Sequence, residues 1–116
     1  MKNKTEKFED LIVWQKAELL TINIYKNFRS LKDYSFRDQI QRAAVSIMNN
    51  IAEGYERRGN KEYSRFLFIA KGSCGEVRSM LHLSLKLNYI SEQEYFSLKD
   101  QAIEISKMLY GLIKKL

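Results

Sequence analysis

The feature that most limits the fold of this chain is the absence of proline together with apolar residues that recur at steps of three and four. Such spacing lines one side of an α-helix. Sandwiches and barrels need many turns, and turns favour proline and glycine, yet this chain of 116 residues has only five glycines. The sequence therefore predicts an all-α protein.

Four segments carry this spacing, and we expect each to form a helix. They run from about Asp10 to Phe28, from about Phe36 to Arg57, from about Lys61 to Leu87 and from about Glu92 to the C-terminus. Asp10 is expected to cap the first helix, and Gly59 with Asn60 to end the second and start the third. Ser91 and Glu94 match the capping-box pattern at the start of the fourth.

The last helix carries an unbroken apolar seam with the spacing of a coiled coil. Its residues are Tyr95, Leu98, Ala102, Ile105, Leu109, Leu112 and Leu116. Because the connections between the expected helices are short, neighbouring helices should run antiparallel. We predict an antiparallel up-down four-helix bundle that forms one domain over residues 1–116.

The composition indicates a globular protein that carries a basic charge. Hydrophobic residues make up 45% and charged residues 29%, and 20 Lys and Arg against 14 Asp and Glu give a net charge of +6. This charge is compatible with a polyanionic partner, although many soluble proteins without such a partner are also basic. The chain has one cysteine and no apolar run of membrane-spanning length, and its amino-terminal stretch lacks a secretion signal. We therefore expect a cytoplasmic protein with no membrane partner.

A polar stripe borders the apolar side of the second expected helix. At 100° per residue, its members fall within an arc of about 80°: Gln39, Arg42, Ser46, Asn50, Glu53 and Arg57. A simple solvated face is usually richer in Lys and Glu. We therefore predict that this stripe and Gly54 fix helix packing or subunit contact, with Glu53 paired to Arg42 or Arg58 of a neighbouring helix or subunit.

The third expected helix has a second side next to its core stripe. Its members are Ile69, Gly72, Ser73, Glu76, Met80, Leu83 and Leu87. The two sides together span about 200°, wider than the roughly 100° that one core face needs. Gly72, Ser73 and Gly75 are small enough to admit another helix. Either a second subunit covers this side, with Gly72, Ser73 and Glu76 in the interface, or the third helix is simply central in its own bundle.

The segment from Gln39 to Val77 resembles the signature of the 23S rRNA intervening-sequence protein family, also called four-helix bundle proteins. Matching residues are Arg42, Ala44, Ser46, Ile47, Asn50, Ile51, Ala52, Glu53, Gly54, Arg58, Glu62, Tyr63, Phe66, Leu67, Ala70, Gly72, Ser73 and Glu76. Met48 departs from the family pattern, which usually has a helix-kinking proline there. The likeness extends over nearly the whole chain.

This resemblance implies a cytosolic antiparallel bundle that assembles into a ring-like homopentamer. The chain is also similar to the accessory variability proteins of diversity-generating retroelements, which are basic pentamers that bind nucleic acid and a reverse transcriptase. For the intervening-sequence family itself, the resemblance supplies no established biochemical role.

Our first functional hypothesis is non-specific binding of RNA or DNA by the charged outer surface of such a ring. The candidate contacts are Arg57, Arg58, Lys61, Arg65, Lys71, Arg78 and Lys86. These residues could instead be ordinary solvated charges. The alternative hypothesis is a scaffold or accessory subunit that docks a protein, for example a reverse transcriptase or a ribosome-associated factor.

An enzyme is not expected, and no catalytic residue, metal ligand or cofactor is predicted. His82 is the only histidine, so the paired Glu-x-x-His motifs of a di-iron bundle cannot form. Cys74 lies on the apolar stripe without an evident His and Asn partner, which indicates an inert core thiol. The stretch around it lacks the lysine of a phosphate-cradling loop.

Overall fold

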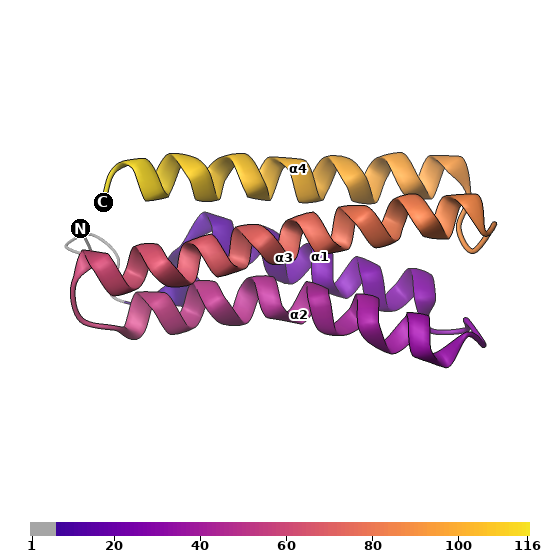
Figure 1. Cartoon of the computed structure of the whole chain (residues 1–116), viewed down its shortest axis with the longest axis horizontal. Helices are drawn as coiled ribbons and strands as arrows, with labels where there is room; N and C mark the ends of the chain where they lie inside the picture. Colours follow the sequence, from indigo (N-terminus) through magenta and orange to yellow (C-terminus); the bar gives the residue numbers. More distant parts are fainter. Residues whose placement is uncertain (1–6) are drawn as a thin grey trace.

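The computed structural model describes residues 7–116, and every regular element within them is helical (Figure 1). A short 3-10 helix, η1, precedes four α-helices. Their bounds are Phe8–Asp10 for η1, Ile12–Phe28 for α1, Tyr34–Glu56 for α2, Asn60–Lys86 for α3 and Glu92–Lys114 for α4. The prediction of four helices and no strands is confirmed for these residues. Part of the amino-terminal stretch used to argue against a secretion signal, residues 1–6, lies outside them.

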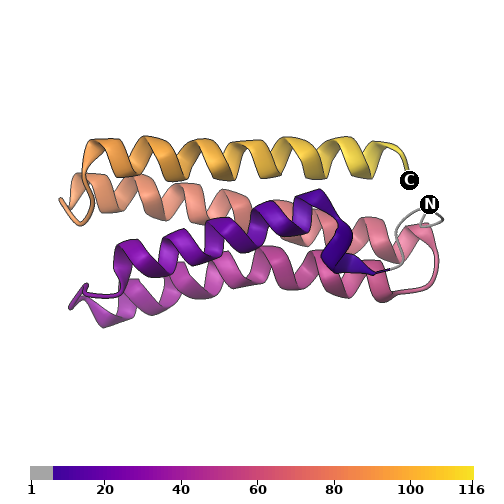
Figure 2. The same cartoon turned by 180° about the vertical axis from the view of Figure 1, so that it is seen from behind.

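The four helices form a bundle in which each one packs against two others. The contacting pairs are α1–α2, α2–α3, α3–α4 and α1–α4, so α1 lies diagonally opposite α3 (Figures 1 and 2). Each helix contributes its predicted apolar stripe to one core, in which Leu20, Ile47, Leu67 and Ile105 are at most 1% exposed. Burial of these stripes is the main stabilising contribution to such a helix assembly.

The start of α1 differs from the prediction, whereas a residue at the start of α2 links the α1–α2 connection to the α3–α4 connection. Asp10 belongs to η1, and the α1 N-cap is Leu11, which makes no side-chain capping bond. The prediction for Asp10 was wrong because the backbone forms a 3-10 turn there. At α2, Asp33 Oδ1 accepts from the Phe36 N–H at 3.2 Å, and Asp33 Oδ2 accepts from the Tyr89 hydroxyl at 2.7 Å. The latter bond raises the pKa of Tyr89.

Backbone geometry sets both ends of α3. Gly59, with φ of +81°, is the N-cap and makes no side-chain cap, whereas Asn60 is the first helical residue. The prediction that Asn60 caps the helix was therefore off by one residue: Gly59 takes the positive φ that the sharp reversal requires. At the other end Asn88 has a φ of 61°, and the Tyr89 N–H donates to the Ser84 carbonyl, as in a Schellman motif.

The capping box that the sequence predicts at the start of α4 is confirmed. The capping box at α4 is present, with the Ser91 N–H donating to Glu94 at 2.8 Å and the Glu94 N–H donating to the Ser91 hydroxyl at 3.0 Å. α2 is helical throughout the region around Met48, where the family pattern has proline. The starts of α2 and α4 are thus defined by the side-chain caps Asp33 and Ser91.

Candidate nucleic-acid interface

Part of the polar stripe on α2 joins this helix to α3. Ser46 Oγ and Ser73 Oγ lie 2.9 Å apart. Asn50 Nδ2 donates to the Ser46 carbonyl at 2.8 Å and to Ser46 Oγ at 3.0 Å. Gln39 and Arg42, in contrast, are exposed on the outer surface of α2. The predicted packing role of Ser46, Asn50 and Ser73 thus acts between two helices of one chain.

Gly54 allows α2 and α3 to approach closely near their connection. A Cβ atom added to Gly54 would lie 2.7 Å from the Phe66 Cβ and 3.2 Å from the Tyr63 ring. Contacts this short between non-bonded carbons are repulsive, so only glycine fits without a shift of α3. The structural role predicted for Gly54 therefore has a direct geometric cause.

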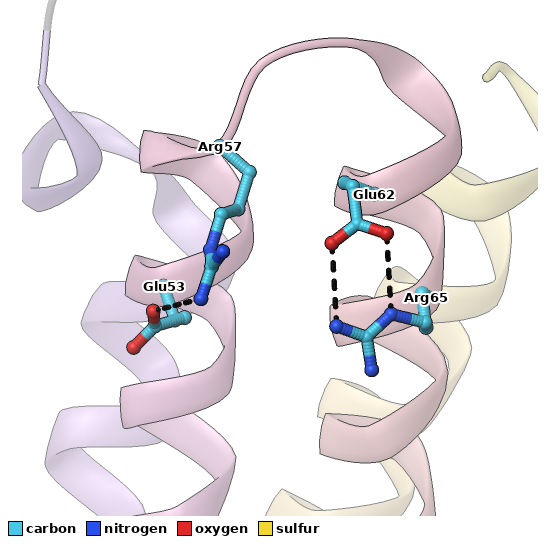
Figure 3. A network of polar contacts seen from close by, with 4 residues as sticks. All are labelled: Glu53, Arg57, Glu62 and Arg65. Atoms are coloured by element: carbon cyan, nitrogen blue, oxygen red, sulfur yellow. Dashed lines mark hydrogen bonds and ion pairs between the residues drawn. The ribbon is translucent and has the colours of Figure 1, made fainter.

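The carboxylate of Glu53 has a different partner from the one predicted. Glu53 is exposed and pairs with Arg57 at 2.7 Å, one helical turn along α2 (Figure 3). Within the chain, Glu53 does not pair with Arg42 or Arg58 as predicted, because its outward position puts Arg57 within reach on the same helix face. Pairing with an arginine of another subunit stays a prediction. The Glu53–Arg57 pair is an ordinary surface ion pair.

A second ion pair lies beside the first on α3. Arg65 binds Glu62 through two nitrogens, at 3.2 and 3.3 Å, and this bonding lowers the pKa of Glu62 (Figure 3). The guanidinium carbons of Arg57 and Arg65 lie 4.9 and 4.5 Å from the centre of the Phe66 ring. Both arginines were predicted to contact nucleic acid, but each is held by a carboxylate and an aromatic ring.

The other predicted contacts fall into three places. Arg58 and Lys61 are exposed around the α2–α3 connection, and Lys86 is exposed in the last turn of α3. Lys71 and Arg78 lie together on the side of α3 that meets α4. The structure therefore does not gather the predicted contacts into one patch.

Two adjoining hollows form a groove between α3 and α4. The first, of about 360 Å³, is lined by Lys71, Arg78, Ile103, Ser106, Lys107 and Tyr110. The second, of about 320 Å³, is lined by Gly75, Arg78, Ser79, His82, Tyr95 and Lys99. Arg78 lines both, and no carboxylate lines either. We call these two hollows the α3/α4 groove.

Ammonium groups lie beside aromatic rings of α4, both in this groove and next to it. The Lys71 and Lys114 ammonium groups lie 5.9 and 5.2 Å from the centre of the Tyr110 ring. Lys99 lies 5.6 Å from the Tyr95 ring and 5.8 Å from the Phe96 ring. These distances are within the range of cation–π attraction. Such contacts orient the rings without neutralising the cations.

No α4 residue of this groove was predicted from the sequence to contact a ligand. A signal was present, because Lys99, Ile103, Lys107, Tyr110 and Lys114 follow one another at steps of three and four beside the apolar seam. This spacing places them on one helix side. Each lysine alone looked like an ordinary solvated charge.

The sequence profile of one protein family matches most of the chain. The profile is that of the 23S rRNA-intervening sequence protein, and the match covers residues 9–111. This chain belongs to the 23S rRNA-intervening sequence protein family. A crystal structure of a protein with unknown function from the S23 ribosomal protein family of Bacteroides thetaiotaomicron is similar, with 28% identity and a TM-score of 0.84 over 89% of this chain and 99% of that one. No curated protein sequence matches.

This member of the 23S rRNA-intervening sequence protein family exposes an apolar strip on α3. Ile69, Leu83 and Leu87 are 41 to 47% exposed, and a Cβ added to Gly72 would meet no atom within 4 Å. The second side of α3 is therefore only partly covered by its own bundle, at Ser73 and Met80. The burial of Ser73 and Met80 is explained by packing of α3 within its own bundle. The exposed residues Ile69, Leu83 and Leu87 are not covered by the other helices that the structure describes.

The helix diagonally opposite carries a second apolar strip. Ile12, Leu19 and Ile22 of α1 are 62, 54 and 43% exposed, and all three point away from the core stripe of that helix. Exposed apolar side chains are common singly, but contiguous groups are typical of contact surfaces. The protein thus exposes several apolar side chains on each of two diagonally opposite helices.

Cys74, the single cysteine of the sequence, is buried in the core. Burial raises the pKa of the Cys74 thiol to about 12, which keeps it protonated and unreactive at neutral pH. Within residues 7–116, no group of three or more His, Cys, Asp or Glu side chains is placed to hold a metal ion. In the same range, no helix is long and apolar enough to cross a bilayer.

Proposed function

We propose that this protein is a non-enzymatic, cytoplasmic oligomer that binds RNA or DNA with little sequence preference. The observation that carries the proposal is the α3/α4 groove, in which Lys71, Arg78, Lys99 and Lys107 face hollows that no carboxylate lines. Cations of this kind neutralise phosphates and release the counterions around them, which is the main source of sequence-independent affinity. No helix-turn-helix or other base-reading motif accompanies them in the sequence.

The proposed assembly is a ring of antiparallel up-down bundles, with five copies as the family resemblance implies. The short connections favour the antiparallel order. The apolar strips on α1 and α3 are different surfaces on diagonal helices, and two different surfaces that bind each other produce a head-to-tail ring. A ring would repeat the groove in every copy, so that several weak contacts together give a high overall affinity for a long nucleic acid.

The test combines mass measurement with nucleic-acid binding. Light scattering of the purified protein should give a multiple of the 13.7 kDa chain, and we expect a pentamer. Fluorescence anisotropy with labelled RNA and DNA should show binding near physiological salt. The logarithm of the binding constant should fall linearly with the logarithm of the salt concentration. Absence of binding except at very low salt would contradict the nucleic-acid role and leave the basic charge as a determinant of solubility.

A second candidate function is a scaffold that docks another protein, such as a reverse transcriptase or a ribosome-associated factor. The apolar strip of α1 favours it if assembly leaves this strip free. Leu19→Asp separates the possibilities, because Leu19 is 54% exposed and its replacement should not disturb the core. An oligomer that keeps its mass in Leu19→Asp would assign α1 to a partner, whereas a smaller species would assign it to the ring.

A further inference from the structure

The groove between α3 and α4 combines positive charge with exposed aromatic rings, which is the combination that single-stranded nucleic acids require. From this combination we infer that the α3/α4 groove binds a single strand, with its phosphates on Lys71, Arg78 and Lys107. Its bases would stack on Tyr110, which lines the groove, and on Phe96, which lies next to the groove residues Tyr95 and Lys99. This inference rests on the proposed nucleic-acid function and adds to it the site and the class of ligand.

The first argument is the separation of charges on the molecule. The ion pairs within residues 7–116 lie elsewhere and join Lys16 to Glu104, Arg37 to Asp38, Arg57 to Glu53 and Arg65 to Glu62. Among the groove cations, none forms an ion pair with a described carboxylate. Asp100 follows Lys99 in the sequence but lines neither hollow. An anionic ligand in the groove would therefore displace no internal partner.

Other hollows of the same protein have a different character. A hollow between α1 and α4 contains Glu94 with several amide side chains and no cation. A hollow beside α2 contains Asp38 together with Arg42. The basic character of the α3/α4 groove is thus a local property and does not simply follow from the net charge of +6. Each of these other hollows, and a further one beside Asp10 and Lys115, is lined by a carboxylate, and the absence of carboxylates distinguishes the α3/α4 groove.

The second argument is the exposure of the aromatic rings. Tyr110 and Phe96 are 50 and 51% exposed although both lie on a helix with a complete apolar seam. The lysines around them keep these rings in place from the side, through the cation–π contacts of Lys71, Lys99 and Lys114. An exposed ring flanked by cations offers a stacking platform for a base that is not already stacked in a duplex.

The third argument is the length of the groove. From Tyr95 to Tyr110 the α4 backbone advances about 22 Å at 1.5 Å per residue. One strand in stacked, helical form has a phosphate about every 3.4 Å along the helix axis, so this distance spans at most about six nucleotides. Sites for single strands on other folds cover roughly 4 to 16 nucleotides. A duplex of the same length would present phosphates to the lysines but keep its bases away from Tyr110.

The test uses the assembled protein and an unstructured oligonucleotide of about 12 nucleotides, within the range of known single-strand sites. The groove variant is Lys71→Gln with Arg78→Gln and Lys107→Gln. Its matched control is Lys26→Gln with Arg29→Gln and Lys32→Gln, which removes the same charge from exposed positions at the α1–α2 end. We expect the groove variant to bind at least tenfold more weakly, with a salt slope smaller by about two, since each phosphate contact contributes about 0.7. The control should bind like the wild type.

The aromatic part of the inference has its own pair of variants. Tyr110→Ala should weaken binding of the single strand by about tenfold, in line with the loss of one base–aromatic stack, and should leave duplex binding nearly unchanged. Tyr34→Ala is the control, because Tyr34 is 59% exposed and also lies beside an arginine, but belongs to α2 and lines neither hollow of the groove. Circular dichroism and light scattering confirm that each variant keeps its helices and its mass.

The outcomes separate this inference from the proposed function. If the wild type binds no nucleic acid, both are overturned. If Arg58→Gln with Lys61→Gln abolishes binding while the groove variant binds normally, the protein binds nucleic acid elsewhere and only the groove assignment fails. Equal affinity for duplex and single strand, with no effect of Tyr110→Ala, would overturn the single-strand class. Tighter binding of polyglutamate than of the oligonucleotide would replace the nucleic acid by an acidic protein segment.

Discussion

The two sides of α3 use polar residues in opposite ways. Where α3 meets α2, polar groups are satisfied within the chain, as in the Ser46–Ser73 contact and the Glu53–Arg57 pair. Where α3 meets α4, Lys71 and Arg78 face hollows without a carboxylate. A polar residue beside a core is therefore not by itself evidence for a ligand, and the presence or absence of an internal partner is the more useful criterion.

The glycines of the two sides show the same contrast. Gly54 on the α2 side has no room for a Cβ, whereas a Cβ added to Gly75 on the α4 side would meet no atom within 4 Å. Close packing of α2 against α3 therefore requires glycine, and the α3/α4 groove does not. Each of the following experiments tests whether the first side is structural and the second is available for binding.

The largest effect is expected from substitution of Gly54. Gly54→Ala should lower the free energy of unfolding by about 1–3 kcal/mol, because the new methyl group overlaps Phe66. Gly75→Ala is the matched control. It should raise the free energy of unfolding by up to about 1 kcal/mol, since alanine is the better helix former where the added methyl group has room. Urea denaturation followed by circular dichroism measures both, and equal effects would remove the contrast between the two sides.

An intermediate effect is expected at the hydroxyl contact between α2 and α3. Ser46→Ala should destabilise the fold by about 1 kcal/mol because Ser73, which is 8% exposed, loses its partner. The double variant with Ser73→Ala should be destabilised by less than the sum of the single variants. Strict additivity in this double-mutant cycle would show that the contact does not contribute to stability.

A small effect is expected for the surface ion pair at the end of α2. Arg57→Gln should change the free energy of unfolding by at most about 0.5 kcal/mol, as is usual for exposed pairs one turn apart. It should also leave the affinity for single strands close to that of the wild type. A loss of affinity as large as that of the groove variant would show that pairing with Glu53 does not prevent Arg57 from binding a ligand.

The smallest effect is a pH dependence from Glu62. Its pKa in the folded protein lies below the ordinary value of 4.5 because Arg65 donates hydrogen bonds to its carboxylate. The stabilisation is therefore present above the unfolded pKa and is lost as the pH falls through the lowered folded pKa. Denaturation at several pH values should show a slightly steeper acid loss for the wild type than for Glu62→Gln, and identical curves would contradict it.

The helices and their core could be predicted because their signals are local and repeated. The steps of three and four fixed the apolar side of each helix, and the Ser91–Glu94 capping box was recognisable from two residues. The exact starts at Asp10 and Asn60 were missed, since a 3-10 turn and a positive φ at Gly59 depend on how the neighbouring chain packs.

The candidate site was harder to predict for a physical reason. The adjacent Arg57 and Arg58 are conspicuous in the sequence, but whether an arginine is free depends on which carboxylate lies within reach. Lys99, Lys107 and Tyr110 are separated in the sequence from Lys71 and Arg78 and meet only across the α3/α4 groove. The spacing of residues along one helix predicts which of them share a face of that helix. It does not predict which residues of another helix lie opposite that face.

The sequence by itself determined that this protein is all-α, where its four helices lie and which side of each is buried, because helical periodicity converts order along the chain directly into a face. Only the tertiary structure decided which charges neutralise one another and which remain available. That outcome depends on distances of a few ångströms between side chains of different helices, and these distances are set by how the helices rotate and pack against their neighbours.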